Sequence, residues 1–343
     1  MSSTHTASGM NYTERVNYLN KIYTSNAANP FKFEPTNINT IGTGRILAMR
    51  SAVTPVRANQ VGQLSMYAFS EDGVWSLKVS SNTGGWSGWE IVNGDVLSNA
   101  DSVCQLDNAV AYITAQGVTI LQGAESACMS SILDGRMHGV VEALPGVSAG
   151  KIDQLLGGLG KVGVKFEDYC KNARLAYDYT NQRLICYNGS YNYYYIYNIA
   201  NPGWGCANER IYSAVNDYPK TWVNCKTKGY VAELSAKHDD EQSVKTYFIT
   251  RATKLDAPDA LKTISNLIVR GNFGRDNLNA VVLLGSRDLI NWHVVGATDK
   301  RVRAIGGSGY KYFKLLVSGV FPSWVKIDAM TIELLERLGN KLI

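Results

Sequence analysis

The residues that most often carry chemistry are few in this chain, and their spacing does not suit it. None of the four histidines belongs to an HExxH motif or to another metal-binding spacing. They are His5, His138, His238 and His293. The acidic run 238–241 (HDDE) could bind a cation, although a solvated turn between domains explains the same residues. The sequence therefore predicts no metal site.

Motifs for nucleotide binding and covalent catalysis are also absent from the sequence. The run 157–161 (GGLGK) resembles a phosphate-binding loop, but no Ser or Thr follows its lysine and no clear strand precedes it. Carboxylates can be paired on paper, for example Asp72 with Asp95 and Asp101 with Asp107. Such pairs hydrolyse sugars only where they converge, and aspartate is equally the residue that β-turns need. We therefore expect no catalytic residue, no cofactor and no enzymatic activity.

The six cysteines and the hydrophobic pattern indicate the cellular compartment in which the protein is assembled. No two cysteines are spaced as CxxC, which argues against a zinc ribbon and a thioredoxin-type site. The N-terminal residues 1–12 are polar and lack the apolar core of a signal peptide. No apolar run reaches the roughly 18 residues that a transmembrane helix needs. We expect reduced thiols in a protein that is assembled in the cytoplasm.

Aromatic side chains are the remaining candidates for binding, with 20 Tyr against 8 Phe. In residues 190–197 (SYNYYYIY), alternate tyrosines fall on one face of an expected strand. An exposed row could stack on sugars or form a subunit interface, whereas a packed row would be core; we favour core or interface. The two tryptophans of the run 84–89 (GGWSGW) could bind a ligand or fold back onto the sheet. The candidate interface or ligand aromatics are Trp86, Trp89, Tyr191, Tyr193, Tyr195 and Tyr197.

Short antiparallel strands must position these side chains. Three hairpins with tight polar turns are expected at 64–79, 108–121 and 174–187, and a strand at 191–199 follows the third. The first two turns end in Gly73 and Gly117, where a left-handed backbone suits glycine. Comparable turns recur after roughly 45 and then roughly 65 residues, a period typical of propeller blades. Three units do not close a ring, so closure would need other parts of this chain or other chains.

Three regions are expected along the chain. Residues 1–40 form an N-terminal arm and linker. Residues 41–240 form a β-propeller-like region with a short helix near 151–171, where apolar residues have helical spacing despite four glycines. Residues 241–343 are expected to form an antiparallel β-sandwich or to close the ring. The predicted fold class is all-β, with β-propeller-like antiparallel blades followed by a β-sandwich-like C-terminal part.

One turn in the last region has a recognisable pattern. Residues 286–292 (SRDLINW) resemble the Asp-box of sialidase-like propellers, in which short polar side chains hold a hairpin turn while a tryptophan packs beneath it. The usual glycine between the aspartate and the tryptophan is absent. Residues 70–75 (SEDGVW) are a looser version of the same pattern. Such boxes are elements of the fold, so they predict β architecture and not catalysis.

Beyond these patterns, the sequence resembles tail proteins of bacteriophages that infect gut Bacteroidales, crAss-like phages among them. The similar segments are Tyr67–Ser81, Asp101–Val110 with Gln116–Val118, Leu175–Arg183, Arg251–Asp259 and Gly285–His293. They follow one another in the same order as in those proteins, and the similarity extends over most of residues 29–320. Proteins of this group are called packaged-DNA stabilisation, nozzle or muzzle proteins.

The resemblance implies a structural subunit, containing a β-propeller, at the distal end of the tail tube of a short-tailed phage. Such nozzles are homo-oligomeric rings, typically hexameric, that contact other tail proteins and hold packaged DNA until ejection. The resemblance therefore implies a location in the virion tail and no catalytic residues. Members of the group are longer, with more β repeats upstream, so this chain is either a shortened homologue or one piece of a longer protein.

The net charge of +5 is compatible with such a conduit. From Glu241 onward the chain has 15 Lys and Arg against 9 Asp and Glu, without a dense cationic run. Each neutralised phosphate adds affinity for DNA, so a conduit suits transient, sequence-independent contact better than strong phosphate binding. An alternative function is a receptor- or glycan-binding adhesin of the same virion, with the run 84–89 exposed. A glycoside hydrolase on a propeller would need acidic residues clustered at one ring face.

Overall fold

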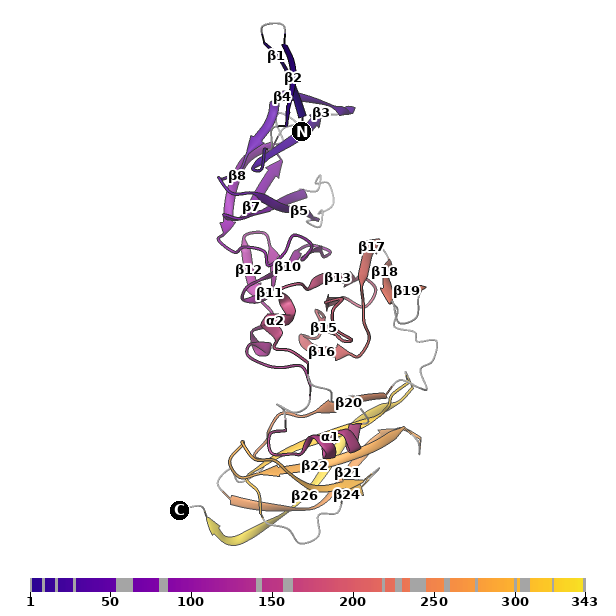
Figure 1. Ribbon diagram of the computed structural model, residues 1–343. Coiled ribbons are helices and arrows are strands. Elements are labelled where there is room, and N and C mark those ends of the chain that lie inside the picture. Colours follow the sequence, from indigo (N-terminus) through magenta and orange to yellow (C-terminus); the bar gives the residue numbers. More distant parts are fainter. Residues whose placement is uncertain are drawn as a thin grey trace, which may run out of the picture. The chain divides into compact units, whose positions relative to one another are not determined.

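The computed structural model of the chain is almost entirely β, which confirms the predicted all-β class (Figure 1). The chain divides into two compact units: unit 1 comprises Met1–Gly135 with Lys165–Ser235, and unit 2 comprises Arg136–Val164 with Ala236–Ile343. The structure describes residues 2–7, 10–15, 18–26, 29–53, 64–79, 86–139, 144–156, 163–217, 220–225, 230–234, 245–255, 260–274, 277–298, 301–302, 309–322 and 324–341.

Unit 1 consists of antiparallel hairpins and small sheets. Two hairpins pair β1 (Ser2–Ala7) with β2 (Met10–Arg15) and β3 (Lys21–Asn26) with β4 (Asn29–Thr40). The first sheet is β5 (Ile46–Val53), β6 (Leu64–Ser70), β7 (Gly73–Val79) and β8 (Trp86–Asn93). The second is β9 (Val103–Gln105), β10 (Val110–Thr114), β11 (Gly117–Gln122) and β12 (Glu125–Cys128). The third is β13 (Arg174–Asp178), β14 (Arg183–Tyr187), β15 (Tyr194–Asn198) and β16 (Gly203–Ala207). The fourth is β17 (Ser213–Asp217), β18 (Lys220–Cys225) and β19 (Tyr230–Glu233).

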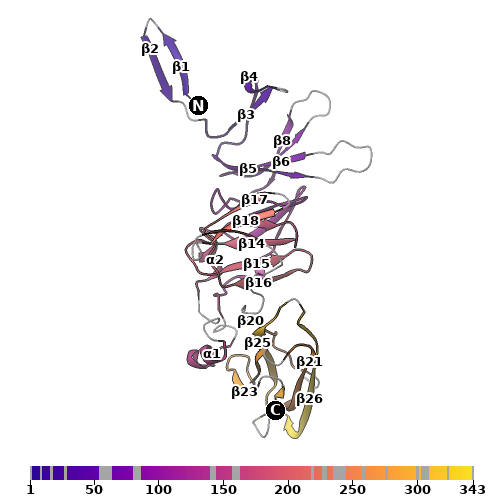
Figure 2. The same cartoon turned by 90° about the vertical axis from the view of Figure 1, so that its right-hand side faces the viewer.

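Each of these four sheets is a meander whose strands lie side by side in chain order, and Figure 2 shows β14, β15 and β16 of the third sheet in this order. The first strand of every sheet is therefore an edge strand. These edge strands are neighbours in series, since β5 contacts β9, β9 contacts β13 and β13 contacts β17. Apolar side chains fill the space between sheets: Phe69 of the first sheet meets Tyr112 of the second, with ring centroids 5.1 Å apart. The third and fourth sheets share a second cluster that includes Ile185 and Val223.

Two-residue turns join the first two predicted hairpins, and their glycines have the predicted conformation; the turn of the third hairpin, between Asp178 and Arg183, is longer. The β6–β7 register closes at Ser70 opposite Gly73, and the β10–β11 register closes at Thr114 opposite Gly117. Gly73 has φ +132° and Gly117 has φ +119°, and residues with a side chain rarely adopt such backbone angles. A Cβ atom at Gly117 would also lie 2.0 Å from the Ser130 hydroxyl. Both conformation and space therefore exclude a side chain there.

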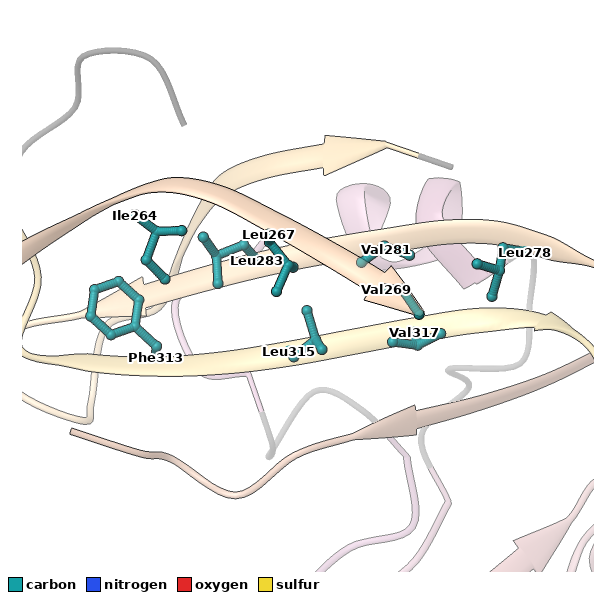
Figure 3. Close-up of a cluster of buried hydrophobic side chains, with 9 residues drawn as sticks. All are labelled: Ile264, Leu267, Val269, Leu278, Val281, Leu283, Phe313, Leu315 and Val317. Atoms are coloured by element: carbon teal, nitrogen blue, oxygen red, sulfur yellow. The ribbon is translucent and has the colours of Figure 1, made fainter. Parts of the chain in front are cut away.

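Unit 2 is a two-layer sandwich with one helix. The first sheet has the order β20-β25-β22-β23 and the second has the order β24-β21-β26. Nine buried apolar side chains from β21, β22 and β25 meet between the layers, as Figure 3 shows. The elements are α1 (Ala149–Leu156), β20 (Lys245–Ile249), β21 (Ala260–Asn272), β22 (Leu278–Ser286), β23 (His293–Thr298), β24 (Arg301–Val302), β25 (Tyr312–Val320) and β26 (Lys326–Lys341).

The segment near 151–171 differs from the predicted short helix. It contains two helices, α1 and α2 (Phe166–Cys170), and residues 157–162 between them lie outside the described residues. Ile152 and Leu156 of α1 pack against Trp292 in unit 2, whereas α2 belongs to unit 1. The division between the units therefore differs from the boundary expected at 240/241, because the apolar faces of the two helices pack on different sheets.

Candidate functional site

The predicted tyrosine row lies in the third sheet of unit 1. The strand β15 begins at Tyr194 and not at Tyr191, so only the second half of the row is in a strand. Tyr193, Tyr195 and Tyr197 are at most 8% exposed, and Tyr191 is half-buried. The row is therefore packed within unit 1 and offers no continuous exposed surface for stacking on sugars.

Tyr169 of α2 is the side chain around which this row packs. Its buried ring stacks on Tyr193 at 5.1 Å between centroids, and Tyr195 meets it edge-on at the same distance. Its hydroxyl donates to the carbonyl oxygens of Tyr193 (2.9 Å) and Cys186 (3.3 Å). Burial raises the pKa of Tyr169 and of Tyr195 far above the ordinary tyrosine range, so both hydroxyls stay protonated. The cluster fixes the helix to the sheet and supplies no acid or base.

The predicted tryptophan pair lies on β8, and the structure places one of its two side chains. Trp89 is half-buried and packs against Ile41 and Leu77, on the face of the first sheet turned away from the second. The side chain of Trp86 and residues 84–85 lie outside the described residues. Trp89 therefore behaves as a side chain folded back onto its sheet, which is one of the two alternatives that the sequence left open.

The turn at residues 286–292 has the hydrogen bonds of an Asp-box. Asp288 Oδ1 accepts the N–H groups of Ile290 (2.9 Å) and Asn291 (2.8 Å), and its Oδ2 accepts Asn291 Nδ2 (2.8 Å). The Ser286 hydroxyl lies 3.0 Å from Oδ1 and donates to it. Trp292 packs beneath the turn and is 1% exposed. The side chains of Ser286 and Asp288 form hydrogen bonds to the turn's own backbone and side chains, so these two residues build structure.

Asp288 makes the stability of unit 2 depend on pH. The N–H and the side chain of Asn291, followed by the N–H of Ile290, hold the pKa of Asp288 well below its ordinary value of 3.8. A carboxylate with a lowered folded pKa stabilises the fold fully above the unfolded pKa, and this stabilisation is lost as the pH falls through the folded pKa. We expect Asp288→Asn to lower the urea midpoint of unit 2 at neutral pH, and the difference from the parent chain to shrink below about pH 4.

Hydrogen exchange of β22 and β23 peptides across a urea series at several pH values measures this effect. Asp328→Asn, at an exposed carboxylate of β26, is the matched control and should leave the pH profile unchanged. A difference between Asp288→Asn and the parent chain that stays constant down to pH 2 would contradict the assignment.

A polar cavity of about 390 Å³ opens where the first strands of the four main sheets of unit 1 meet. Arg50 comes from β5, Cys104 from β9, Arg174 from β13 and Asn216 from β17. Arg174 forms an ion pair with Asp101 at 2.8 Å. Among the described residues Arg50 makes no ion pair, and its guanidinium donates to the Met49 carbonyl at 2.8 Å. The cavity thus carries one excess positive charge and can accept a small polar or anionic group.

Cys104 is the cavity residue closest in type to a nucleophile, but its surroundings suppress that chemistry. It is 1% exposed, and Asn216 Nδ2 donates to its sulfur at 3.0 Å. Burial raises the pKa of the Cys104 thiol to about 12, which outweighs the lowering effects of Asn216 and Arg50. Because the thiolate is the reactive form, this thiol is inert at neutral pH.

The carboxylates that could be paired on paper each serve the fold. Asp72 accepts the backbone N–H groups of Thr43 and Gly44, each at 2.6 Å. These bonds lower the pKa of Asp72, the one from Gly44 most strongly. The other partners are Tyr112 for Asp95 (3.0 Å), Arg174 for Asp101 (2.8 Å) and Tyr177 for Asp107 (2.9 Å). Each of the four carboxylates therefore has a partner within the fold.

The remaining candidates give no binding site within the described ranges. The runs 157–161 and 238–241 lie outside them. His138 is 6% exposed, and its backbone N–H donates to the Val164 carbonyl. In the part of the chain that the structure describes, no three His, Cys, Asp or Glu side chains gather as metal ligands. No described helix has the length and hydrophobicity needed to span a membrane.

The polar cavity is the feature that sequence reasoning missed. Its residues come from four different sheets, and no short motif contains more than a few of them. A weak signal existed, because Asp101, Leu175 and Tyr179 belong to segments that carry the resemblance to tail proteins. The convergence of these segments depends on the packing of the sheets, which the spacing of residues along the chain does not encode.

Comparison with known proteins gives no family for this chain. No protein-family model matches it, and no curated protein matches its sequence. Among solved structures, a protein named glycoside hydrolase is similar over 82% of this chain and 83% of its own, with 8% sequence identity and a TM-score of 0.25. A similarity at that TM-score carries no argument about fold or function.

Proposed function

We propose that this chain is a non-enzymatic structural subunit of a bacteriophage tail, which forms the distal nozzle of the DNA conduit and contributes to genome retention and ejection. The observation that carries the proposal is where the segments resembling tail proteins lie. Tyr67–Ser81 includes the β6–β7 turn, Leu175–Arg183 spans the β13–β14 turn, and Gly285–His293 is the Asp-box turn. The shared residues therefore build turns and sheet cores, as a protein that serves as a wall requires.

The arrangement of unit 1 supports a β-propeller-like architecture for this wall. The first and second meanders share one apolar cluster and the third and fourth share another. The first strands of all four follow one another as neighbours, as the innermost strands of blades do. Further sheets, from another chain or from more of the same protein, would close the ring.

The outer face of the fourth sheet supports assembly into a homo-oligomeric ring. Val215 on β17 and Trp222 on β18 lie directly opposite each other, and they are 62% and 36% exposed. Val231 on β19 is 61% exposed. On this face Lys220 pairs with Glu233 at 3.0 Å beside the tryptophan ring. An apolar centre with a charged rim is typical of protein interfaces. A sheet of a neighbouring subunit could therefore pack on this face as the sheets of unit 1 pack on one another.

Replacing Trp222 with serine should therefore weaken self-association by at least about tenfold, since buried tryptophans dominate interface energies. Sedimentation velocity of the full chain over a range of concentrations measures the effect. Trp324→Ser, at a tryptophan that is 49% exposed in unit 2, is the matched control and should leave association unchanged. A parent chain that stays monomeric at every concentration, or an equal loss in the control, would contradict the ring.

The charge pattern supports transient contact with packaged DNA. The net charge of the chain is +5, and its Lys and Arg residues are spread along the sequence, so few DNA phosphates would be neutralised together. The alternative of a glycan-binding adhesin has less support, because Trp89 and the tyrosine row are packed against their own sheets.

Electron microscopy of virions from the phage that encodes the chain tests the proposal. The expected result is density for unit 1 in a ring at the distal end of the tail. Density in the capsid shell, or absence of the chain from purified virions by mass spectrometry, would overturn it. Assembly in the host cytoplasm follows from the same proposal.

A further inference from the structure

An apolar cavity of about 480 Å³ lies between the two sheets of unit 2. Leu267, Leu283, Phe313 and Leu315 line it with buried side chains that point into the space between the layers, as Figure 3 shows. Met330 and Ile332 of β26 are half-buried and line it from the second sheet. Its volume lies within the range of cavities that hold small molecules, which are mostly apolar with a few polar groups.

The segment 250–253 also lines the cavity and offers hydrogen-bond donors. Thr250 and Thr253 accept backbone N–H groups of Leu315 (2.9 Å) and Leu255 (3.2 Å) at their hydroxyl oxygens, so the hydroxyl hydrogens remain available to a ligand. Arg251 is exposed, and within the described ranges it makes no ion pair. A guanidinium is always charged and donates only. The polar side chains of this segment therefore suit a group that only accepts, and a carboxylate is such a group.

We propose that this cavity binds an amphipathic carboxylate, with its hydrocarbon chain between the sheets and its carboxylate at Arg251. The apolar lining accounts for the chain, and Arg251 with the two threonine hydroxyls accounts for the head group. Lys314 also lines the cavity, but its Nζ lies over the Trp292 ring, 4.5 Å from the centroid. Arg251 belongs to the segment Arg251–Asp259, one of those that resemble tail proteins, and the proposed structural role does not use its charge. The inference stands independently of the proposed function, because it concerns unit 2 alone.

Titration of the full chain with dodecanoate, below its micelle concentration, tests the proposal. We expect saturable binding at one site. Decanoate should bind about tenfold or more weakly, because each buried methylene contributes about fourfold in affinity. Dodecanol should bind about fivefold more weakly than dodecanoate, the worth of an exposed charge pair.

The variant Arg251→Gln should abolish the preference for the acid over the alcohol. Arg270→Gln is the matched control, because Arg270 is an exposed arginine of β21 that does not line the cavity. Both positions are exposed, so both variants should fold. Bound dodecanoate should also slow hydrogen exchange of residues 250–253 and 330–332.

Several results would overturn the proposal. These are the absence of saturable binding, equal affinity for acid and alcohol, equal effects of the two arginine variants, or protection confined to other segments. Vesicles of phosphatidylglycerol provide the second arm, since a membrane lipid also joins hydrocarbon chains to an anion. Flotation of the chain with these vesicles, without binding of free dodecanoate, would show binding to a membrane surface and reject the cavity as a carboxylate site.

Discussion

Replacing Tyr169 with alanine should lower the free energy of unfolding of unit 1 by about 4 kcal/mol, as expected for a large aromatic side chain deleted from a core. The ring is fully buried and contacts Tyr191, Tyr193 and Tyr195, so its removal leaves a cavity between α2 and the third sheet. The hydroxyl shares its one hydrogen between two backbone carbonyl oxygens, those of Tyr193 and Cys186. Urea unfolding followed by hydrogen exchange of β14 and β15 peptides measures the loss.

The variant Tyr169→Phe separates the ring from the hydroxyl. It keeps the ring contacts and should cost about 1–2 kcal/mol, because it removes only the hydrogen bonds. Tyr191→Ala, at the half-buried end of the same row, should cost less than Tyr169→Ala. An alanine variant at position 169 that is no less stable than the phenylalanine variant would contradict the role of the ring.

Trp292→Ala should have an effect of similar size on unit 2, about 4 kcal/mol. Its ring fills the space beneath α1, where it packs with Leu144, Ile152 and Leu156, and Lys314 Nζ lies 4.5 Å from the ring centroid. Hydrogen exchange of β22 and β23 during urea unfolding reports on this core.

Leu289→Gly, in the same turn, is the matched control for this variant. Leu289 has φ +66°, a conformation that costs a residue with a side chain about 1–2 kcal/mol. Relief of this strain offsets the larger conformational entropy that glycine loses on folding, so the variant should be neutral or slightly stabilising. A large loss of stability in Leu289→Gly would show that the turn tolerates no change, and Trp292→Ala would then not report on the core.

Local signals in the sequence predicted the hairpins because hairpins depend on local residues. Alternating apolar residues and glycines at the turns specify two neighbouring strands, and Gly73 and Gly117 have the expected left-handed conformation. The Asp-box was equally readable, although its glycine is missing. Leu289 adopts the left-handed conformation in this turn, and the hydrogen bonds of Asp288 hold the turn.

Features that depend on long-range packing could not be predicted in the same way. Of the helical segment, α2 lies in unit 1 and α1 in unit 2. Helical spacing identifies an apolar face and not the sheet that covers it, so this division could not be predicted. The polar cavity brings Arg50 and Arg174 together from strands of different sheets. The cavity between the layers of unit 2 likewise depends on how β26 lies against β21.

The strand order within each sheet has a consequence for biosynthesis. In the four main sheets of unit 1, every strand pairs with the next in the chain, so a nascent polypeptide can complete one sheet before the ribosome has made the following one. Unit 2 lacks this property, because β21 pairs with β26 and β20 with β25. Its sandwich must wait for its last strand to leave the exit tunnel, and until then β21 is exposed to incorrect pairing.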